Sequence, residues 1–117
     1  MGTFRVDIQV SDREGARARD VAALVDTGAF LTMLPTSLLT GLGIVPTKTE
    51  TFSLADGSTV QMETGGAVIH LNGDHVTTIV VFGPDDAEPL LGAYTLEGLA
   101  LTVDPRNSQL IKAKLTL

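Results

Sequence analysis

The residues best suited to chemistry are Asp26, Thr27 and Gly28, which directly follow the apolar residues 21–25. A carboxylate carried into a protein interior is costly unless it is paired, hydrogen-bonded or protonated. Gly28 allows the backbone to turn sharply beside the carboxylate, and Thr27 supplies a hydroxyl for a hydrogen bond. The three residues therefore indicate either a carboxylate held ready for acid–base chemistry or a simple turn at the end of a strand.

Composition limits the classes of function. The chain has 117 residues, 44% of them hydrophobic, which predicts one domain over residues 1–117. Its 8 Lys and Arg against 14 Asp and Glu give a net charge of −6, which opposes binding to nucleic acid. The sequence contains no cysteine. No apolar run approaches the roughly 18 residues that a membrane span needs, and residues 1–10 lack the pattern of a signal peptide. We expect a soluble, cytoplasmic protein that binds neither nucleic acid nor membrane.

The spacing of apolar residues predicts mainly β-strands. Residues 4–10 alternate apolar with polar side chains, and residues 21–25 are continuously apolar, as in a strand covered on both faces. Four dipeptides that favour turns divide the later chain: Asp56-Gly57, Gly65-Gly66, Asn72-Gly73 and Gly83-Pro84. The strands predicted between and after them lie near residues 50–55, 58–64, 67–72, 75–82, 101–104 and 110–117.

Two short helices are expected among the strands. Pro35 is suited to the first position of a helix that runs to Leu39 and closes at Gly41 or Gly43. Residues 93–99 can form one or two further helical turns, and the polar residues 11–19 are typical of a turn. Many short strands with frequent turns predict an all-β sandwich or barrel with one or two short helices.

Three stretches resemble the retroviral-type, or retropepsin-like, aspartic proteases. "ALVDTGAFLTMLP" (residues 23–35) resembles the active-site loop of that family, and "PLLGAYTLEGLALTVD" (89–104) resembles its second signature. "SLADGSTVQM" (53–62) lies where the family has its flap, a hairpin that closes over substrate. The wording "LLGAYTLEGL" and "VDP" is closest to the small prokaryotic members. The resemblance implies an all-β retropepsin-like acid-protease barrel with an active site at a twofold dimer interface.

The resemblance also implies roles for individual residues. The chain has a single Asp-Thr/Ser-Gly sequence, so the second catalytic carboxylate would be Asp26 of a second copy, and a homodimer would be the active unit. The supporting residues fall into three groups: Thr27, Gly28 and Ala29 in the active-site loop, Ala55, Asp56 and Gly57 at the flap tip, and Leu90, Leu91 and Gly92 packed beneath the loop.

Paired carboxylates would explain how identical residues act as acid and base. Two carboxylates about 4 Å apart at an effective dielectric constant of about 20 repel by roughly 4 kcal/mol, which separates their protonation steps by about three pH units. The ionised carboxylate would accept a proton from a shared water while the protonated one donates to the peptide carbonyl. The implied enzyme is an aspartic endopeptidase that acts on peptide or protein substrates without metal or cofactor.

Two other interpretations of this loop stay open. The flap tip carries the charge of Asp56 where viral enzymes have glycines and an aliphatic residue, which would suit a non-catalytic peptide-binding or dimerisation module of the same fold. If Asp26 only starts a turn, the protein is a stable monomer. Residues 110–117 would form an interface sheet in the family, or else an edge strand whose lysines prevent aggregation.

Three further clusters each allow a site and a plainer interpretation. His70 and His75 with Asp74 form a metal pair or a surface pair. Asp85, Asp86 and Glu88 form a calcium loop or a solvated turn, although their spacing fits no Ca²⁺ loop pattern. Arg13, Arg17 and Arg19 form a basic patch or a solvated hairpin tip. In each case the plainer interpretation is favoured.

Overall fold

The computed structural model describes residues 3–117, and Met1 and Gly2, part of the segment without a signal-peptide pattern, lie outside the described residues. The strands are β1 (Arg5–Ser11), β2 (Ala18–Val25), β3 (Thr32–Pro35), β4 (Lys48–Ser53), β5 (Thr59–Leu71), β6 (Asp74–Gly83), β7 (Leu90–Leu91), β8 (Leu101–Asp104) and β9 (Gln109–Lys112). The helices are α1 (Thr36–Gly41) and α2 (Ala93–Gly98). Neither helix is long and apolar enough to cross a membrane, in the part of the chain described.

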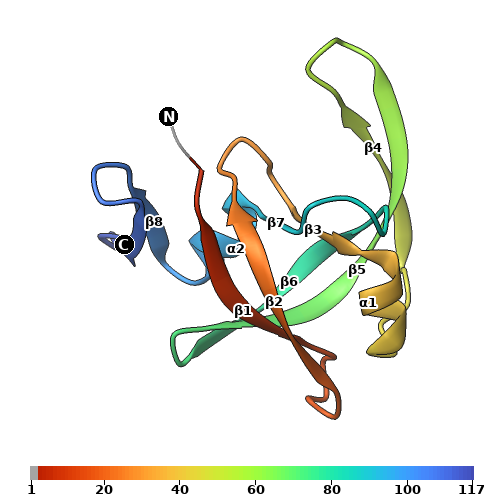
Figure 1. The fold of residues 1–117 in the computed structure, drawn as a ribbon, viewed down its shortest axis with the longest axis horizontal. Helices are drawn as coiled ribbons and strands as arrows, with labels where there is room; N and C mark the ends of the chain where they lie inside the picture. Colours follow the sequence, from red (N-terminus) through yellow and green to blue (C-terminus); the bar gives the residue numbers. More distant parts are fainter. Residues whose placement is uncertain (1–2) are drawn as a thin grey trace.

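A closed sheet forms the body of the molecule (Figure 1). Seven strands pair in the order β1-β2-β7-β3-β6-β5-β4, and β1 also pairs with β5. This extra pairing bends the sheet into a barrel around one apolar core, to which Val10, Leu34 and Leu91 contribute fully buried side chains. The β4–β5 hairpin stands out from this body in Figure 1, whereas β8 and β9 form a separate two-stranded sheet near the C-terminus.

The predicted mostly β fold with two short helices is confirmed, because its local signals agree with the tertiary structure. In β1, Ile8 and Val10 are buried while Asp7 and Gln9 are exposed, as the alternation predicts. Asn72 and Gly73 both have positive φ, at 52° and 81°, and join β5 to β6. That conformation is the one that a two-residue hairpin turn requires.

The turn predicted at Gly65-Gly66 is wrong. These residues lie inside β5, a continuous strand of 13 residues. A Cβ at Gly65 would lie 2.8 Å from the Val45 carbonyl oxygen and 3.1 Å from the Phe82 ring. Glycine is present here because two other segments approach the strand closely.

Three other boundaries, and the burial of one strand, differ from the predictions. The turn between β1 and β2 is shorter than the predicted residues 11–19, since β2 already begins at Ala18. Ala22 on β2 is exposed, so this strand is not covered on both faces as predicted. Pro35 ends β3, and α1 begins one residue later. The last strand ends at Lys112, and residues 113–117 have no regular structure. Pairing with β8 reaches only this far, because the register joins Leu101 to Lys112.

Gly65→Ala should lower the free energy of unfolding by about 1–3 kcal/mol, because the new methyl group must displace the backbone at Val45. Gly66→Ala is the matched control, since a Cβ there would make an ordinary 3.6 Å contact with Arg13. We expect the free energy of unfolding of the control, measured in urea, to lie within about 0.5 kcal/mol of that of the parent. Equal stability of the two variants would contradict the close approach at Gly65.

Candidate active site

The loop of residues 26–31 connects β2 to β3, and β7 lies between those two strands. Leu24 and Val25 of β2 pair in parallel with Leu90 and Leu91, while Met33 of β3 pairs antiparallel with Leu90. A strand from a later part of the chain therefore occupies the space inside the β2–β3 connection. The loop is consequently supported from beneath by β7 and by the first turn of α2.

Three backbone hydrogen bonds attach the loop to this later segment along its length. They run from Asp26 N–H to the Leu91 carbonyl at 3.0 Å, from Ala93 N–H to the Ala29 carbonyl at 2.9 Å, and from Tyr94 N–H to the Phe30 carbonyl at 2.9 Å. Each bond satisfies a group that a loop would otherwise leave to solvent. We call this set of contacts the loop clamp.

Gly92 lies at the centre of the loop clamp. A Cβ at this position would lie 2.5 Å from the carbonyl carbon of Leu31 and 2.9 Å from the amide nitrogen of Thr32. The Gly92 N–H also donates a buried hydrogen bond of 3.0 Å to Thr32 Oγ1. Leu91 and Gly92 thus contact the ends of the loop, while Leu90 pairs with the strands on either side of it. Their predicted supporting role stays a prediction.

The Asp26 side chain is half-buried at the start of the loop. Its Oδ1 accepts a hydrogen bond of 3.0 Å from Gly28 N–H, and its own carbonyl accepts one of 3.1 Å from Ala29 N–H. Within residues 3–117 the carboxylate makes no other hydrogen bond or ion pair, so Oδ2 is free to meet a group from outside this chain. One oxygen is therefore held by the loop, while the other has no partner among residues 3–117.

The neighbours of Asp26 differ in exposure. Thr27 and Gly28 are exposed, and Ala29 is half-buried. A Cβ on Gly28 would lie only 3.2 Å from Asp26 Oδ1, so glycine here protects the hydrogen bond that orients the carboxylate. The exposed Thr27 is placed where its hydroxyl can meet another molecule, and its predicted bracing role stays a prediction.

Sequence reasoning missed two neighbours of Asp26. Phe30 is 66% exposed although it is aromatic, and its ring lies 5.5 Å from the ring of Tyr94, which is 42% exposed. Thr32 is fully buried and accepts the Gly92 N–H. For Phe30 the available signal was a large aromatic ring within a polar loop, whereas Thr32 carried no local signal, because its partner Gly92 lies 60 residues away in sequence.

The predicted flap tip is an ordered turn between β4 and β5. The Asp56 carboxylate accepts hydrogen bonds from Ser58 N–H at 2.9 Å and from the Ser58 hydroxyl at 2.6 Å. These bonds lower the pKa of Asp56, with the side-chain bond as the larger cause. Gly57 has a φ of 88°, which glycine adopts without strain. Ala55, Asp56 and Gly57 are all exposed.

The histidine pair does not gather a third ligand. His70 and His75 lie directly opposite each other in β5 and β6, with ring centroids 5.7 Å apart. The Asp74 carboxylate accepts the His75 backbone N–H at 2.8 Å, and His70 shares a 3.1 Å hydrogen bond with Ser11. No group of three or more metal-ligating side chains occurs among residues 3–117.

Two carboxylates of the acidic loop before β7 bind protein groups. Asp85 accepts the Ser37 backbone N–H at 2.8 Å, in the first turn of α1. Glu88 forms an ion pair of 2.6 Å with Arg5 at the start of β1. These contacts give the loop a structural purpose, since they attach it to α1 and to β1.

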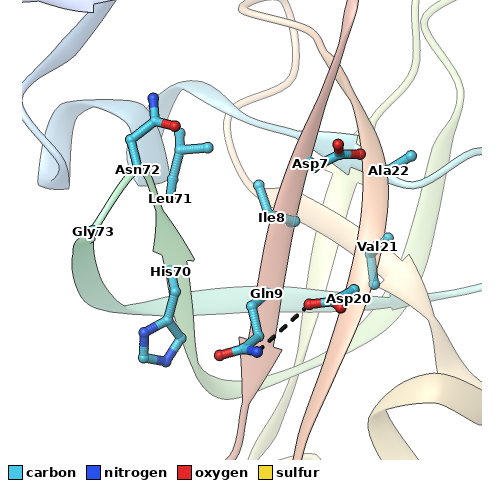
Figure 2. A pocket seen from close by; sticks show the side chains of 10 residues that line it. All are labelled: Asp7, Ile8, Gln9, Asp20, Val21, Ala22, His70, Leu71, Asn72 and Gly73. Atoms are coloured by element: carbon cyan, nitrogen blue, oxygen red, sulfur yellow. Dashed lines mark hydrogen bonds between the residues drawn. The ribbon is translucent and has the colours of Figure 1, made fainter.

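A separate hollow of about 640 Å³ lies on the outer side of β1 and β2, beside the end of β5 (Figure 2). Its polar lining includes Asp7, Asp20 and His70, and Gln9 Nε2 donates a long 3.5 Å hydrogen bond to Asp20. None of the residues that line it belongs to the Asp26 loop or to the flap. Figure 2 shows the carboxylates of Asp7 and Asp20 apart from each other, so they do not form an acid–base pair.

Ser58→Ala should raise the pKa of Asp56 toward the ordinary aspartate range, because both the hydroxyl donor and the fixed tip are lost. In the parent, the hydrogen bonds at the tip persist above the lowered pKa and weaken as the pH falls through it. Carboxyl-carbon NMR titration measures the shift. Asp104 is the internal control, since Asn107 is the largest cause of its lowered pKa and should keep it unchanged.

Gly92→Ala should destabilise the protein by about 3 kcal/mol or more, because the added Cβ overlaps backbone atoms that cannot rotate away. Gly41→Ala is the control, since its Cβ would meet only the Arg19 side chain at 3.8 Å. Denaturant unfolding followed by circular dichroism compares the two variants. A Gly92→Ala protein as stable as the control would show that the loop clamp tolerates a side chain.

Comparisons with known proteins agree with this geometry. The family described as "gag-polyprotein putative aspartyl protease" matches residues 16–98, which include the Asp26 loop, the flap and α2. No curated protein matches the chain in sequence.

Solved structures show the same fold. The EIAV protease in complex with the inhibitor HBY-793 has a TM-score of 0.60 and 20% identity, over 99% of this chain and 94% of its own. The solution structure of the simian foamy virus (mac) protease has a TM-score of 0.54 and 20% identity, over 80% of this chain and 94% of its own. The predicted retropepsin-like fold is confirmed, and the chain belongs to the gag-polyprotein aspartyl protease family.

Proposed function

We propose that the protein is a homodimeric aspartic endopeptidase in which the Asp26 residues of two copies activate one water. The observation that carries the proposal is the Asp26 loop itself. Its carboxylate is oriented through Oδ1 by Gly28 N–H, its Oδ2 is free, and the adjacent Thr27 is exposed. Family membership supports the same chemistry.

The reaction follows from the repulsion between two carboxylates that share one site. One Asp26 is ionised and the other is protonated, because two adjacent negative charges disfavour each other. The ionised carboxylate takes a proton from the water as its oxygen attacks the peptide carbonyl carbon, and the protonated one donates to the carbonyl oxygen. A proton then passes to the leaving nitrogen as the C–N bond breaks. The two protonation steps belong to the pair.

Apolar side chains that are exposed in a single copy support the proposal that a second copy binds to it. Phe30 extends from the same loop as Asp26, while Leu115 in the C-terminal tail is 74% exposed and Leu117 is fully exposed. The small sheet of β8 and β9 has only two strands, and such a hairpin gains stability when further strands or a partner cover it. We propose that residues 110–117 of both copies meet at this interface.

The substrate is proposed to be an extended peptide bound between the flap and the Asp26 loop. A peptide in this conformation presents alternate side chains to opposite sides, so pockets for alternate residues would set its sequence preference. The projecting β4–β5 hairpin supplies the backbone groups that such a strand requires. This arrangement needs no metal or cofactor.

A second candidate function is a non-catalytic peptide-binding or dimerisation module. The observation in its favour is the flap tip, where the charged Asp56 binds its own neighbour Ser58. A flap tip held by these hydrogen bonds is suited to a fixed conformation, whereas a flap that closes over a substrate must change its conformation. The two functions differ in whether Asp26→Asn removes a measurable activity.

The proposal also includes the subgroup of the family and the location of the protein in the cell. We place the chain nearest the small prokaryotic members of the family, on the wording of residues 90–99 and 103–105. We also propose a cytoplasmic location, because a sequence without cysteine suits a reducing compartment. Fractionation of the source cells tests the location, and recovery outside the cytoplasm would overturn it.

Asp26→Asn should reduce peptide cleavage by at least about 10³-fold, because the neutral amide cannot accept the proton of the attacking water. The measurement is cleavage of a diverse unstructured peptide library at a series of pH values from about pH 3 to pH 7, because the proposed reaction requires one carboxylate of the pair to be ionised and the other protonated. Folding and oligomeric size must match those of the parent.

Asp20→Asn is the matched control, since Asp20 is an exposed aspartate outside the Asp26 loop and the flap. It should cleave like the parent. Cleavage by the Asp26→Asn protein at the parent rate would eliminate the shared carboxylates as catalyst. A parent that is dimeric and binds peptides but never cleaves them would favour the binding module.

A further inference from the structure

Three buried threonines lie side by side beneath the Asp26 loop. Thr32 begins β3, Thr95 lies in α2, and Thr78 lies in β6. Thr32 and Thr95 are 0% exposed, and Thr78 is 4% exposed. Their oxygens form a chain, with 2.7 Å between Thr32 Oγ1 and Thr95 Oγ1 and 3.2 Å between Thr95 Oγ1 and Thr78 Oγ1. We call it the hydroxyl chain.

The hydroxyl chain ends on the loop clamp. Gly92 N–H donates to Thr32 Oγ1 at 3.0 Å, so the series runs from the backbone between β7 and α2 through three side chains to β6. Each hydroxyl can both donate and accept, which lets the chain be satisfied in either direction. In the described residues no buried side-chain nitrogen or oxygen lacks a partner.

Burial of three hydroxyls needs a reason, because valine has nearly the same shape and no desolvation cost. Replacing both partners of a buried hydrogen bond by apolar groups is often nearly neutral for stability. Hydrogen bonds differ from apolar contacts in being directional, and a satisfied network fixes one arrangement of the elements that it joins. Here those elements are β3, α2 and β6, which meet where the Asp26 loop ends.

We propose that Thr32, Thr95 and Thr78 are positioning residues for catalysis. The hydroxyl chain fixes the position of Thr32, at the end of the Asp26 loop, relative to Gly92. The hydrogen bonds of the loop clamp in turn hold Asp26 in a fixed position relative to the same segment. The inference rests on the proposed function, since two Asp26 carboxylates must lie close enough to share a water. Small displacements of reacting groups are costly, with about a 10²-fold loss of rate for a misplacement near 1 Å.

Thr95→Val is the central test, because it removes the middle hydroxyl and keeps the shape of the side chain. We expect kcat to fall at least about tenfold while KM changes less than about twofold, because the substrate still binds but the carboxylates are misplaced. Thr95→Ser keeps the hydroxyl and should restore kcat. Ser11→Ala is the control, since it removes another buried hydroxyl, bonded to His70, far from the loop in sequence.

Amide hydrogen exchange supplies a readout that does not need activity. In Thr95→Val the amides of Gly28 and Ala29 should exchange at least about tenfold faster, whereas that of the core residue Val10 should not change. Dimer size, measured by sedimentation, should equal that of the parent. Faster exchange throughout the protein would indicate general destabilisation and overturn the inference.

The remaining outcomes separate the two proposals. Unchanged kcat and unchanged exchange in Thr95→Val would reduce the hydroxyl chain to a structural feature and leave the peptidase intact. An equal loss of kcat in Ser11→Ala would have the same meaning. If the parent itself cleaves no peptide, the proposed function fails, and hydrogen exchange in the loop alone tests the inference. Faster exchange confined to the loop amides of Thr95→Val would support the positioning role. Unchanged exchange of those amides would overturn it.

Discussion

The structure of this site depends on one steric constraint, the contact between the backbone of Gly92 and the backbone at Leu31 and Thr32. Any Cβ at residue 92 would overlap the Leu31 carbonyl group. Only glycine therefore allows the chain to leave β7 and enter α2 while still lying between β2 and β3. The conformation of the Asp26 loop is consequently set by a segment 60 residues away in sequence, and local turn preference alone does not determine it.

This constraint changes what the carboxylate can do. A flexible loop would let Asp26 turn into solvent, where a carboxylate is best hydrated. The loop clamp instead holds the backbone of residues 26, 29 and 30, and Gly28 N–H binds one carboxylate oxygen. The site within one chain thereby contains a single oriented acid and an unused oxygen. In the proposed peptidase the second acid–base group would be Asp26 of a second copy, so twofold symmetry would supply it without a second motif in the sequence.

Local sequence signals predicted most of the fold. The alternation in β1, the Asn72-Gly73 turn, the Asp56-Gly57 turn and the helix after Gly92 all depend on residues close together in the chain. Gly65 shows where such reasoning fails. Its lack of a side chain reflects the approach of Val45 and Phe82, which no local pattern reveals, and so a continuous strand was mistaken for a turn.

The buried threonines could not be predicted for a related reason. Thr32, Thr78 and Thr95 are separated by at least 17 residues, and each alone is an ordinary threonine in a strand or helix. The end of β9 is a different case, because alternation continues through Leu117 while pairing stops at Lys112. Alternation indicates that a segment can form a strand, but a partner strand must be present to pair with it. In the proposed homodimer, a second copy would supply that partner for residues 113–117.

Charge adds a requirement to such a pairing. In the proposed homodimer, two copies with a net charge of −6 each would repel at long range, so their contact would have to rely on apolar burial and on local charge. Residues 110–117 combine both, since they carry Lys112 and Lys114 and no acidic residue, beside Leu115 and Leu117. Residues 110–117 are thus a basic, apolar segment in an otherwise acidic sequence. In the proposed homodimer, the lysines of this segment would be attracted to the acidic surface of the second copy, and its leucines would be buried there.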